Sequence, residues 1–284
     1  IFKKQEKKMF TPKLIVTDLD GTALNNNKEI TTETIKAFER CRKKGIHIAI
    51  ATARYIVGAS YYARKLHVDF QILTDGTLVY ENGRLVYSRT MTKDMTNDII
   101  NELKKYDCTS HIAIPTTTAL YRFPANIANP AAAGINAAAN GKKTENQSFN
   151  NIKQDHSPGI YFDIDKSFPE EACKIVAHIS DNNIAKAIAD KCGCEYFHYR
   201  GETTYTFFHK KASKLDAIKH MADYLDISLK DICAFGDDIN DIEMIEHCGY
   251  GVAMANALDI VKEKADFVTL SNEENGVAKV LDEF

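Results

Sequence analysis

Two short segments of the chain are rich in carboxylates and follow apolar runs. Asp18 and Asp20 stand two positions apart, directly after the run 13–17, and Gly21 comes next. If the extended backbone persists, side chains two positions apart point the same way, so both carboxylates reach one place. One of them can act as a nucleophile and the other as a general acid and base. An Asx turn after a strand explains an isolated pair equally well.

The second segment, residues 236–241, carries three aspartates and also follows an apolar run. A helix start favours one or two acidic residues, but three exceed what a cap requires. If the two strand ends are neighbours, carboxylates of both segments crowd one volume; these are Asp18, Asp20, Asp237 and Asp241. Like charges there raise each other's pKa unless a cation intervenes. Oxygen ligands without His or Cys favour a hard cation, and a few carboxylates plus water suit Mg²⁺ better than Ca²⁺.

Three further residues can bind an anion. Thr52 and Arg54 follow the apolar run 46–51, and their hydroxyl and guanidinium groups can hold phosphate oxygens. A helix cap and a solvated charge are the ordinary alternatives for these two residues. Lys214 follows the helix-capping Ser213, although the helix dipole disfavours a cation there, so a nearby anion explains it better.

Alternating strand and helix patterns surround these residues at both ends of the chain. The strand-like runs are residues 13–17, 46–51, 70–73 and 232–235. Helices are expected after the N-caps Thr31 and Ser213, and Asn82-Gly83 indicates a hairpin. Strand–helix–strand order implies right-handed crossovers and a parallel sheet with helices on its faces. We therefore predict the α/β fold class, with a Rossmann-like parallel-sheet core formed by residues 9–87 and 204–284.

The middle of the chain, residues 88–203, breaks this rhythm and is predicted to be an inserted α+β domain. Its expected helices and strands are residues 94–106 and 169–180, and residues 111–114, 159–164 and 195–199. Residues 123–151 are rich in Ala, Asn and Gly without a clear period, so we expect a long loop there.

The composition excludes two classes of partner. Thirty-six Lys and Arg against 39 Asp and Glu give a net charge of −3, whereas a nucleic-acid binder carries a basic excess. No apolar run approaches the ~20 residues of a membrane span, and the basic residues 1–8 lead into no apolar segment of a signal peptide. The seven scattered cysteines do not form a secreted disulfide framework. We therefore expect a cytoplasmic monomer or weak homo-oligomer whose partners include neither nucleic acid nor a membrane.

The sequence resembles the haloacid dehalogenase superfamily, and within it the Cof-type phosphatases. The residues similar to the family's four motifs are, in order, Asp18-x-Asp20-Gly21-Thr22, Thr52, Lys214 and Gly236-Asp237-Asp238-x-Asn240-Asp241. The family inserts a large cap between the second and third motifs, where residues 88–203 stand here, so the resemblance implies a substrate-specificity cap. Two positions depart from the pattern: Ala53 replaces the usual Gly, and Asp75 replaces the usual Asn of Thr-Asn-Gly.

The resemblance also implies a role for each matched residue. Asp18 would attack phosphorus to form an aspartyl-phosphate, and Asp20 would protonate the leaving group and later activate water. The implied ligands of Mg²⁺ are Asp18, Asp20 through its backbone carbonyl, Asp237 and Asp241. The residues expected to bind substrate are Thr52, Arg54, Asp75, Gly76 and Asn240, and Lys214 joins Thr52 and Asn240 in holding the phosphoryl oxygens.

We therefore expect a Mg²⁺-dependent phosphatase that hydrolyses small phosphorylated metabolites, in particular sugar phosphates. Two alternatives stay open. A phosphomutase would use the same chemistry but return the phosphoryl group to substrate. A catalytically silent regulator would bind a phosphometabolite without turnover, although binding alone gives no reason for the acid–base residue Asp20.

Overall fold

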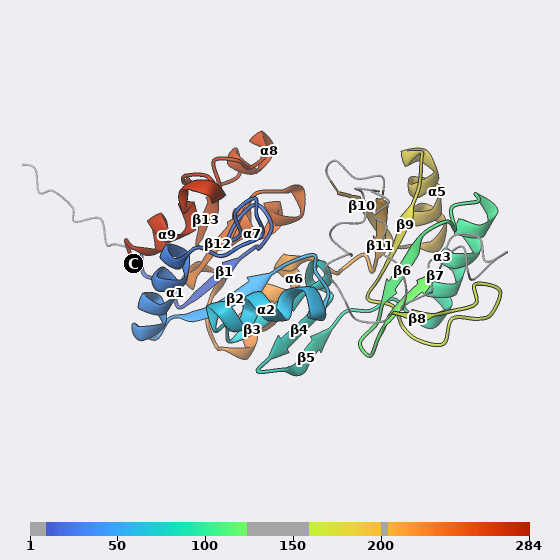
Figure 1. The fold of residues 1–284 in the computed structure, drawn as a ribbon, viewed down its shortest axis with the longest axis horizontal. Helices are drawn as coiled ribbons and strands as arrows, with labels where there is room; N and C mark the ends of the chain where they lie inside the picture. The colour runs from blue at the N-terminus through green and yellow to red at the C-terminus, as the bar shows by residue number, and fades with distance from the viewer. Residues whose placement is uncertain (1–9, 124–158, 200–203) are drawn as a thin grey trace, which may run out of the picture. The chain divides into compact units, whose positions relative to one another are not determined.

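The chain folds into two compact units in a computed structural model, which describes residues 10–123, 159–199 and 204–284 (Figure 1). The first unit joins Ile1–Tyr87 to Ser213–Phe284, and the second is Ser88–Ala212. We call them the core unit and the inserted unit. The predicted α/β class is confirmed, because the core unit has a largely parallel sheet with helices and the inserted unit has its own mixed sheet.

An eight-stranded sheet of the order β14-β13-β12-β1-β2-β3-β4-β5 forms the centre of the core unit. Its strands are β1 (Leu14–Thr17), β2 (His47–Ala51), β3 (Phe70–Leu73), β4 (Leu78–Glu81), β5 (Arg84–Ser88), β12 (Ile232–Gly236), β13 (Tyr250–Ala253) and β14 (Phe267–Val268). Pairing is parallel from β14 to β3 and becomes antiparallel at β4. Because chain order runs outward from β1 on both sides, β1 is the switch point at whose carboxyl edge open α/β sheets bind ligands.

Helices of the core unit lie in two groups. They are α1 (Thr32–Lys43), α2 (Ile56–Leu66), α6 (Lys214–Tyr224), α7 (Ile242–His247), α8 (Asp259–Lys262) and α9 (Gly276–Leu281), with short 3-10 turns η1 (Thr74–Gly76), η3 (Leu229–Asp231), η4 (Ile239–Asp241) and η5 (Asn272–Glu274). Helix α1 contacts α2 and α9, so helices from the two sequence segments of the core unit lie side by side, and α7 contacts α6 and α8 (Figure 1). The predicted N-caps are present: the side chains of Thr31 and Ser213 accept hydrogen bonds from the backbone of Thr34 and Asp216.

The inserted unit contains a six-stranded sheet of the order β10-β11-β9-β6-β7-β8. Its elements are α3 (Lys93–Lys105), β6 (Ile112–Pro115), β7 (Leu120–Phe123), β8 (Ile160–Tyr161), β9 (Lys174–His178), α5 (Asn182–Cys192), β10 (Glu195–His198) and β11 (Thr204–Phe208). Helices α3 and α5 contact each other, and their apolar residues Ile99, Ile188 and Leu103 share one core with Ile114 and Phe207 of the sheet. None of the helices in the described ranges of either unit combines the length and hydropathy of a membrane-spanning helix.

Two sequence-based expectations for the inserted segment differ from the structure, and one helix there was not expected. The helix predicted at residues 169–180 is wrong, because Lys174–His178 form strand β9 with Ile175 and Ala177 in the core. Val176 on the opposite face is also buried, and a short run buried on both faces cannot be distinguished from a helix by periodicity. The following helix α5, capped by Asp181, was not expected, and β8 is shorter than predicted. The loop expected at residues 123–151 lies outside the described residues beyond Phe123, which ends β7.

The boundary between the units also differs from the expected one. Residues 204–212 were expected in the core, but the return to the core unit falls at Ser213. The reason is that β11 pairs with β9 and β10, so Thr204–Phe208 belongs to the sheet of the inserted unit.

Candidate active site

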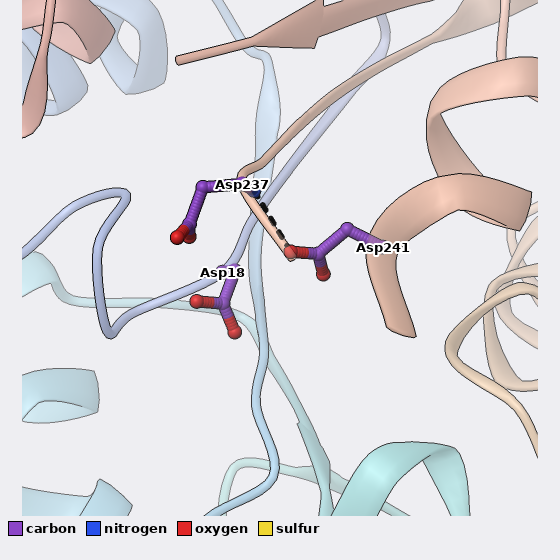
Figure 2. A group of neighbouring side chains, drawn as sticks. All are labelled: Asp18, Asp237 and Asp241. Carbon is purple, nitrogen blue, oxygen red and sulfur yellow. Dashed lines mark hydrogen bonds between the residues drawn. The ribbon is translucent and has the colours of Figure 1, made fainter. Parts of the chain in front are cut away.

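Three carboxylates gather at the carboxyl ends of β1 and β12. Strands β1 and β12 are parallel neighbours with Thr17 opposite Phe235, and the amide of Asp18 donates to the carbonyl of Phe235 at 3.0 Å. Asp18, Asp237 and Asp241 each offer an oxygen within 4.8 Å of the others (Figure 2). We call these three residues the carboxylate cluster. It exists because parallel pairing brings together the ends of two strands that are far apart in the sequence.

Lys214 supplies a cation to this cluster from the first turn of α6. Its Nζ atom lies 2.7 Å from Oδ1 of Asp18 and 2.6 Å from Oδ1 of Asp241, and its side chain is only 1% exposed. Burial favours the neutral amine, but the two carboxylates outweigh it and raise the pKa of Lys214 above its ordinary value. The lysine is therefore a fixed cation.

Asp241 is oriented by the loop that carries it. Its second oxygen accepts hydrogen bonds from the backbone N–H groups of Asp237 and Asp238, at 2.9 and 3.1 Å (Figure 2 draws the first of them). Gly236 makes room for this side chain, since a Cβ atom there would lie 2.4 Å from Cβ of Asp241. Asp241 is fully buried and connects the loop to Lys214.

Asp237 is oriented from the opposite segment. The hydroxyl of Thr22 donates to Oδ1 of Asp237 at 2.7 Å. Gly21, with φ +82°, lets the carboxylate approach, because a Cβ atom there would lie 2.3 Å from its Oδ2. Burial and the charge of Asp241 raise the pKa of Asp237 to about 7. Sequence reasoning assigned no role to Thr22, and its position directly after Gly21 was the available signal.

The donor set of the cluster fits a hard divalent cation. Burial raises the pKa of Asp18 well above its ordinary value; the charges of Asp241 and Asp237 add to this effect, and Lys214 opposes it. A cation bound among these oxygens would offset the repulsion, and oxygen donors without His or Cys select hard ions. The described residues thus bring together Asp18, Asp237 and Asp241 of the four predicted metal ligands.

The fourth predicted ligand, Asp20, points its carboxylate elsewhere. Arg54 donates from Nε to Oδ2 at 2.7 Å and from Nη2 to Oδ1 at 2.8 Å, and Lys28 reaches Oδ1 at 2.8 Å. Burial would raise the pKa of Asp20, but these hydrogen bonds and charges lower it to about 2. Lys28 was not singled out from the sequence, because a lysine in a loop carries no distinguishing signal.

The remaining predicted substrate residues surround the ends of β2 and β3. The backbone carbonyl of the buried Thr52 accepts a hydrogen bond from the backbone amide of Asp75. The side-chain amide of Asn240 donates to Oδ1 of Asp75 at 2.9 Å. Asp75 itself has φ +59°. Gly76, with φ +93°, packs against the start of α6, since a Cβ atom there would lie 2.1 Å from the carbonyl oxygen of Ser213. This turn therefore supports the helix that carries Lys214.

Comparison with known proteins gives four consistent matches. A model of the haloacid dehalogenase-like hydrolases matches residues 15–281. The putative phosphatase YxeH of Bacillus subtilis is 31% identical over 95% of this chain and 97% of its own length. The 5-amino-6-(5-phospho-D-ribitylamino)uracil phosphatase YitU of the same organism is 25% identical over 96% of this chain and 97% of its own. The solved structure of the sugar phosphatase BT4131, of subclass IIB, shares the fold with a TM-score of 0.77 at 21% identity, covering 96% of this chain and 98% of that one.

The α/β core and its inserted unit agree with this family model, and the curated relatives named here cover at least 95% of this chain. These findings define the protein as a phosphatase. The chain belongs to the haloacid dehalogenase-like hydrolase family, where it is similar to the Cof-type phosphatases.

Proposed function

We propose that this phosphatase is Mg²⁺-dependent and hydrolyses small phosphorylated metabolites, sugar phosphates in particular, through an aspartyl-phosphate on Asp18. The observation that carries the proposal is the pairing of Asp18 with Lys214 inside the carboxylate cluster. A carboxylate next to a fixed cation, at the switch point of an open α/β sheet, is suited to attack a bound phosphoryl group.

In the first step, an oxygen of Asp18 would form a bond to phosphorus while the bond from phosphorus to the substrate oxygen breaks. Asp20 would give its proton to the leaving oxygen, which departs as an alcohol. Lys214, Thr52 and Asn240 would bind the phosphoryl oxygens as charge is redistributed in the transition state, because phosphoryl transfer depends chiefly on such electrostatic stabilisation.

In the second step, Asp20 would take a proton from water as the water oxygen attacks the phosphorus of the aspartyl-phosphate. The bond between Asp18 and phosphorus breaks, inorganic phosphate leaves, and both carboxylates return to their starting forms. Asp18, Asp237, Asp241 and the backbone carbonyl of Asp20 would hold Mg²⁺. When bound, Mg²⁺ would neutralise the carboxylates and the phosphate oxygens and so permit attack by one anion on another.

The substrate class rests on the names of similar proteins. YitU acts on a phosphorylated ribitylamino compound and BT4131 is named a sugar phosphatase. Both names describe polyhydroxylated phosphate esters, which supports the same class for this chain. We further propose that the inserted unit is the cap that selects among such esters.

Phosphate release from p-nitrophenyl phosphate and from a panel of sugar phosphates tests the proposal. We expect Mg²⁺-dependent release that EDTA abolishes and a loss of more than about 10³-fold in Asp18→Asn. We expect little change in Asp69→Asn, a half-buried carboxylate that directly precedes β3 and so lies at the amino end of that strand. Acid-quenched wild type should contain a phosphorylated species that Asp18→Asn lacks. Full activity of Asp18→Asn or with EDTA would refute the mechanism, and an isomerised sugar phosphate without free phosphate would favour a phosphomutase.

A further inference from the structure

Cations bind both carboxylate oxygens of Asp20. Arg54 makes two parallel hydrogen bonds, from Nε and Nη2, and Lys28 adds a third contact on Oδ1. Such a bidentate fork fixes the plane of a carboxylate as well as its position. The Arg54 side chain is only 7% exposed and that of Asp20 is 29% exposed, so this ion pair is partly shielded from water. Asp20 is thus held in a single orientation rather than left to rotate at a loop.

Tyr62, on α2, supports both cations. The guanidinium group of Arg54 lies over its ring, 4.9 Å from the centroid, and its hydroxyl donates to the backbone carbonyl of Lys28 at 2.9 Å. Lys28 sits in a tight turn with φ +61°, so its placement depends on contacts such as this one. We call Arg54, Lys28 and Tyr62 the Asp20 clamp.

We propose that the Asp20 clamp holds the Asp20 carboxylate in place for proton transfer, so that Arg54 and Lys28 act on the reaction through Asp20 and not as ligands of the phosphoryl group. The inference rests on the proposed function, because it needs Asp20 as the acid of the first step. Arg54 and Lys28 favour the ionised form of Asp20 and lower its pKa to about 2, so the clamp would contribute through the orientation of the carboxyl group and not by supplying the proton. It reassigns Arg54, which sequence reasoning placed among the phosphate ligands.

The two possible roles of Arg54 differ in how they depend on the leaving group. A proton donor contributes little when the leaving group is weakly basic, as p-nitrophenolate is. It contributes much when the leaving group is more basic, as unsubstituted phenolate is. A ligand of the phosphoryl oxygens contributes to both reactions alike, because the transferred group is the same. Phenyl phosphate and p-nitrophenyl phosphate form a matched pair, since they have similar shapes but leaving groups of different basicity.

The test compares kcat/KM for these two probes at saturating Mg²⁺, because kcat/KM reports the steps up to release of the leaving group. We expect Arg54→Gln to lose about 10²-fold on phenyl phosphate and less than about tenfold on p-nitrophenyl phosphate. Lys28→Met should show the same selectivity with a smaller loss, and Arg54→Lys should recover part of the activity on phenyl phosphate. Asp20→Asn supplies the reference pattern for loss of the proton donor.

Two further measurements separate positioning from phosphate binding. In the Asp20→Asn background, adding Arg54→Gln should change kcat/KM by less than about threefold, because residues that act as a unit are not additive. The inhibition constant of inorganic phosphate should also be nearly unchanged in Arg54→Gln. Equal losses on both probes, a gain on phenyl phosphate, an undiminished effect in Asp20→Asn, or much weaker phosphate inhibition would each overturn the inference.

Matched controls remove other charges from the core unit. Arg40→Gln breaks an exposed pair with Asp282, and Lys13→Met breaks an exposed pair with Asp231. Lys13 directly precedes β1 and Arg40 lies in the last turn of α1, so both are at the amino ends of the strands. Neither variant should alter the ratio of the two probes. A wild type inactive on every phosphate ester would refute the proposed function itself, whereas an active wild type with unselective clamp variants would refute only this inference.

Discussion

The ammonium nitrogen of Lys214 lies 2.7 Å from Oδ1 of Asp18, although 196 positions separate the two residues. The same nitrogen contacts Asp241, and all three side chains are buried. A buried carboxylate is stable only when its charge is offset by a partner. The two sequence segments of the core unit therefore depend on one another for charge balance, and this dependence can be measured.

Replacing Lys214 should destabilise the fold strongly. In Lys214→Met the carboxylates of Asp18 and Asp241 lose their shared cation, and removing one partner of a buried ion pair costs about 3–5 kcal/mol. Urea denaturation without divalent cations gives the free energy of unfolding. The control Lys13→Met removes a lysine whose side chain is 60% exposed, and an exposed pair contributes only about 0–1 kcal/mol. Similar losses in the two variants would contradict this account of Lys214.

Thr22 should affect the binding of Mg²⁺ without touching the ion. Its hydroxyl fixes the carboxylate of Asp237, and losing a residue that orients a metal ligand typically lowers metal affinity about 10–100-fold. Thr22→Val keeps the shape of the side chain. The affinity follows from the dependence of the melting temperature on Mg²⁺ concentration, a readout that needs no turnover. The control Thr96→Val also removes a buried hydroxyl, but one that donates to the backbone carbonyl of Thr92, and it should leave the affinity for Mg²⁺ unchanged. Equal affinities in wild type and Thr22→Val would refute the role of the hydroxyl.

The pH dependence of stability should depend on Asp237. Its pKa is raised from 3.8 to about 7, so the folded chain keeps a proton there that the unfolded chain loses near pH 4. Folding therefore takes up this proton between the two values. The contribution of Asp237 to the free energy of unfolding thus falls as pH rises from about 4 to 7 and stays low above that window.

Asp237→Asn removes this titration. Without divalent cations, we expect the melting temperature of the variant minus that of wild type to increase from pH 5 to pH 8 by several degrees, at about 2–4 °C per kcal/mol. Saturating Mg²⁺ should reverse the difference at pH 8, because wild type then has its full ligand set. A difference that does not change with pH would show that Asp237 carries no raised pKa.

Much of the core unit could be predicted because its signals are local. Thr31 and Ser213 cap helices through contacts three residues away, and apolar runs marked the strands around β1. Carboxylates after two such runs predicted a shared edge of the sheet, since parallel strands end together. The proximity of Asp18 to Asp241 follows from that topology, while the roles of these residues stay proposals.

What could not be predicted depends on tertiary contacts. Strand β9 is buried on both faces, so its sequence has no strand-like alternation and is consistent with a helix. Strand β11 belongs to the inserted unit because it pairs with β9. Lys28 and Arg54 have no spacing that connects them to Asp20. A turn with positive φ and the ring of Tyr62 bring these charges together, and neither is visible in a pattern of residue types.

Asp75 should influence which substrates are accepted. Its carboxylate binds the side chain of Asn240, a proposed ligand of the phosphoryl group, so a negative charge lies next to that ligand. Asp75→Asn removes the charge, and Asn tolerates the left-handed backbone at φ +59°, so the turn should be retained. We expect KM to fall several-fold for phosphate esters that carry a second anionic group and to change less than about twofold for neutral sugar phosphates. Steady-state kinetics with glucose 6-phosphate and 6-phosphogluconate, which differ by a carboxylate, provides the comparison. A parallel change in both KM values would mean that Asp75 acts on Asn240 alone and does not discriminate between leaving groups by charge.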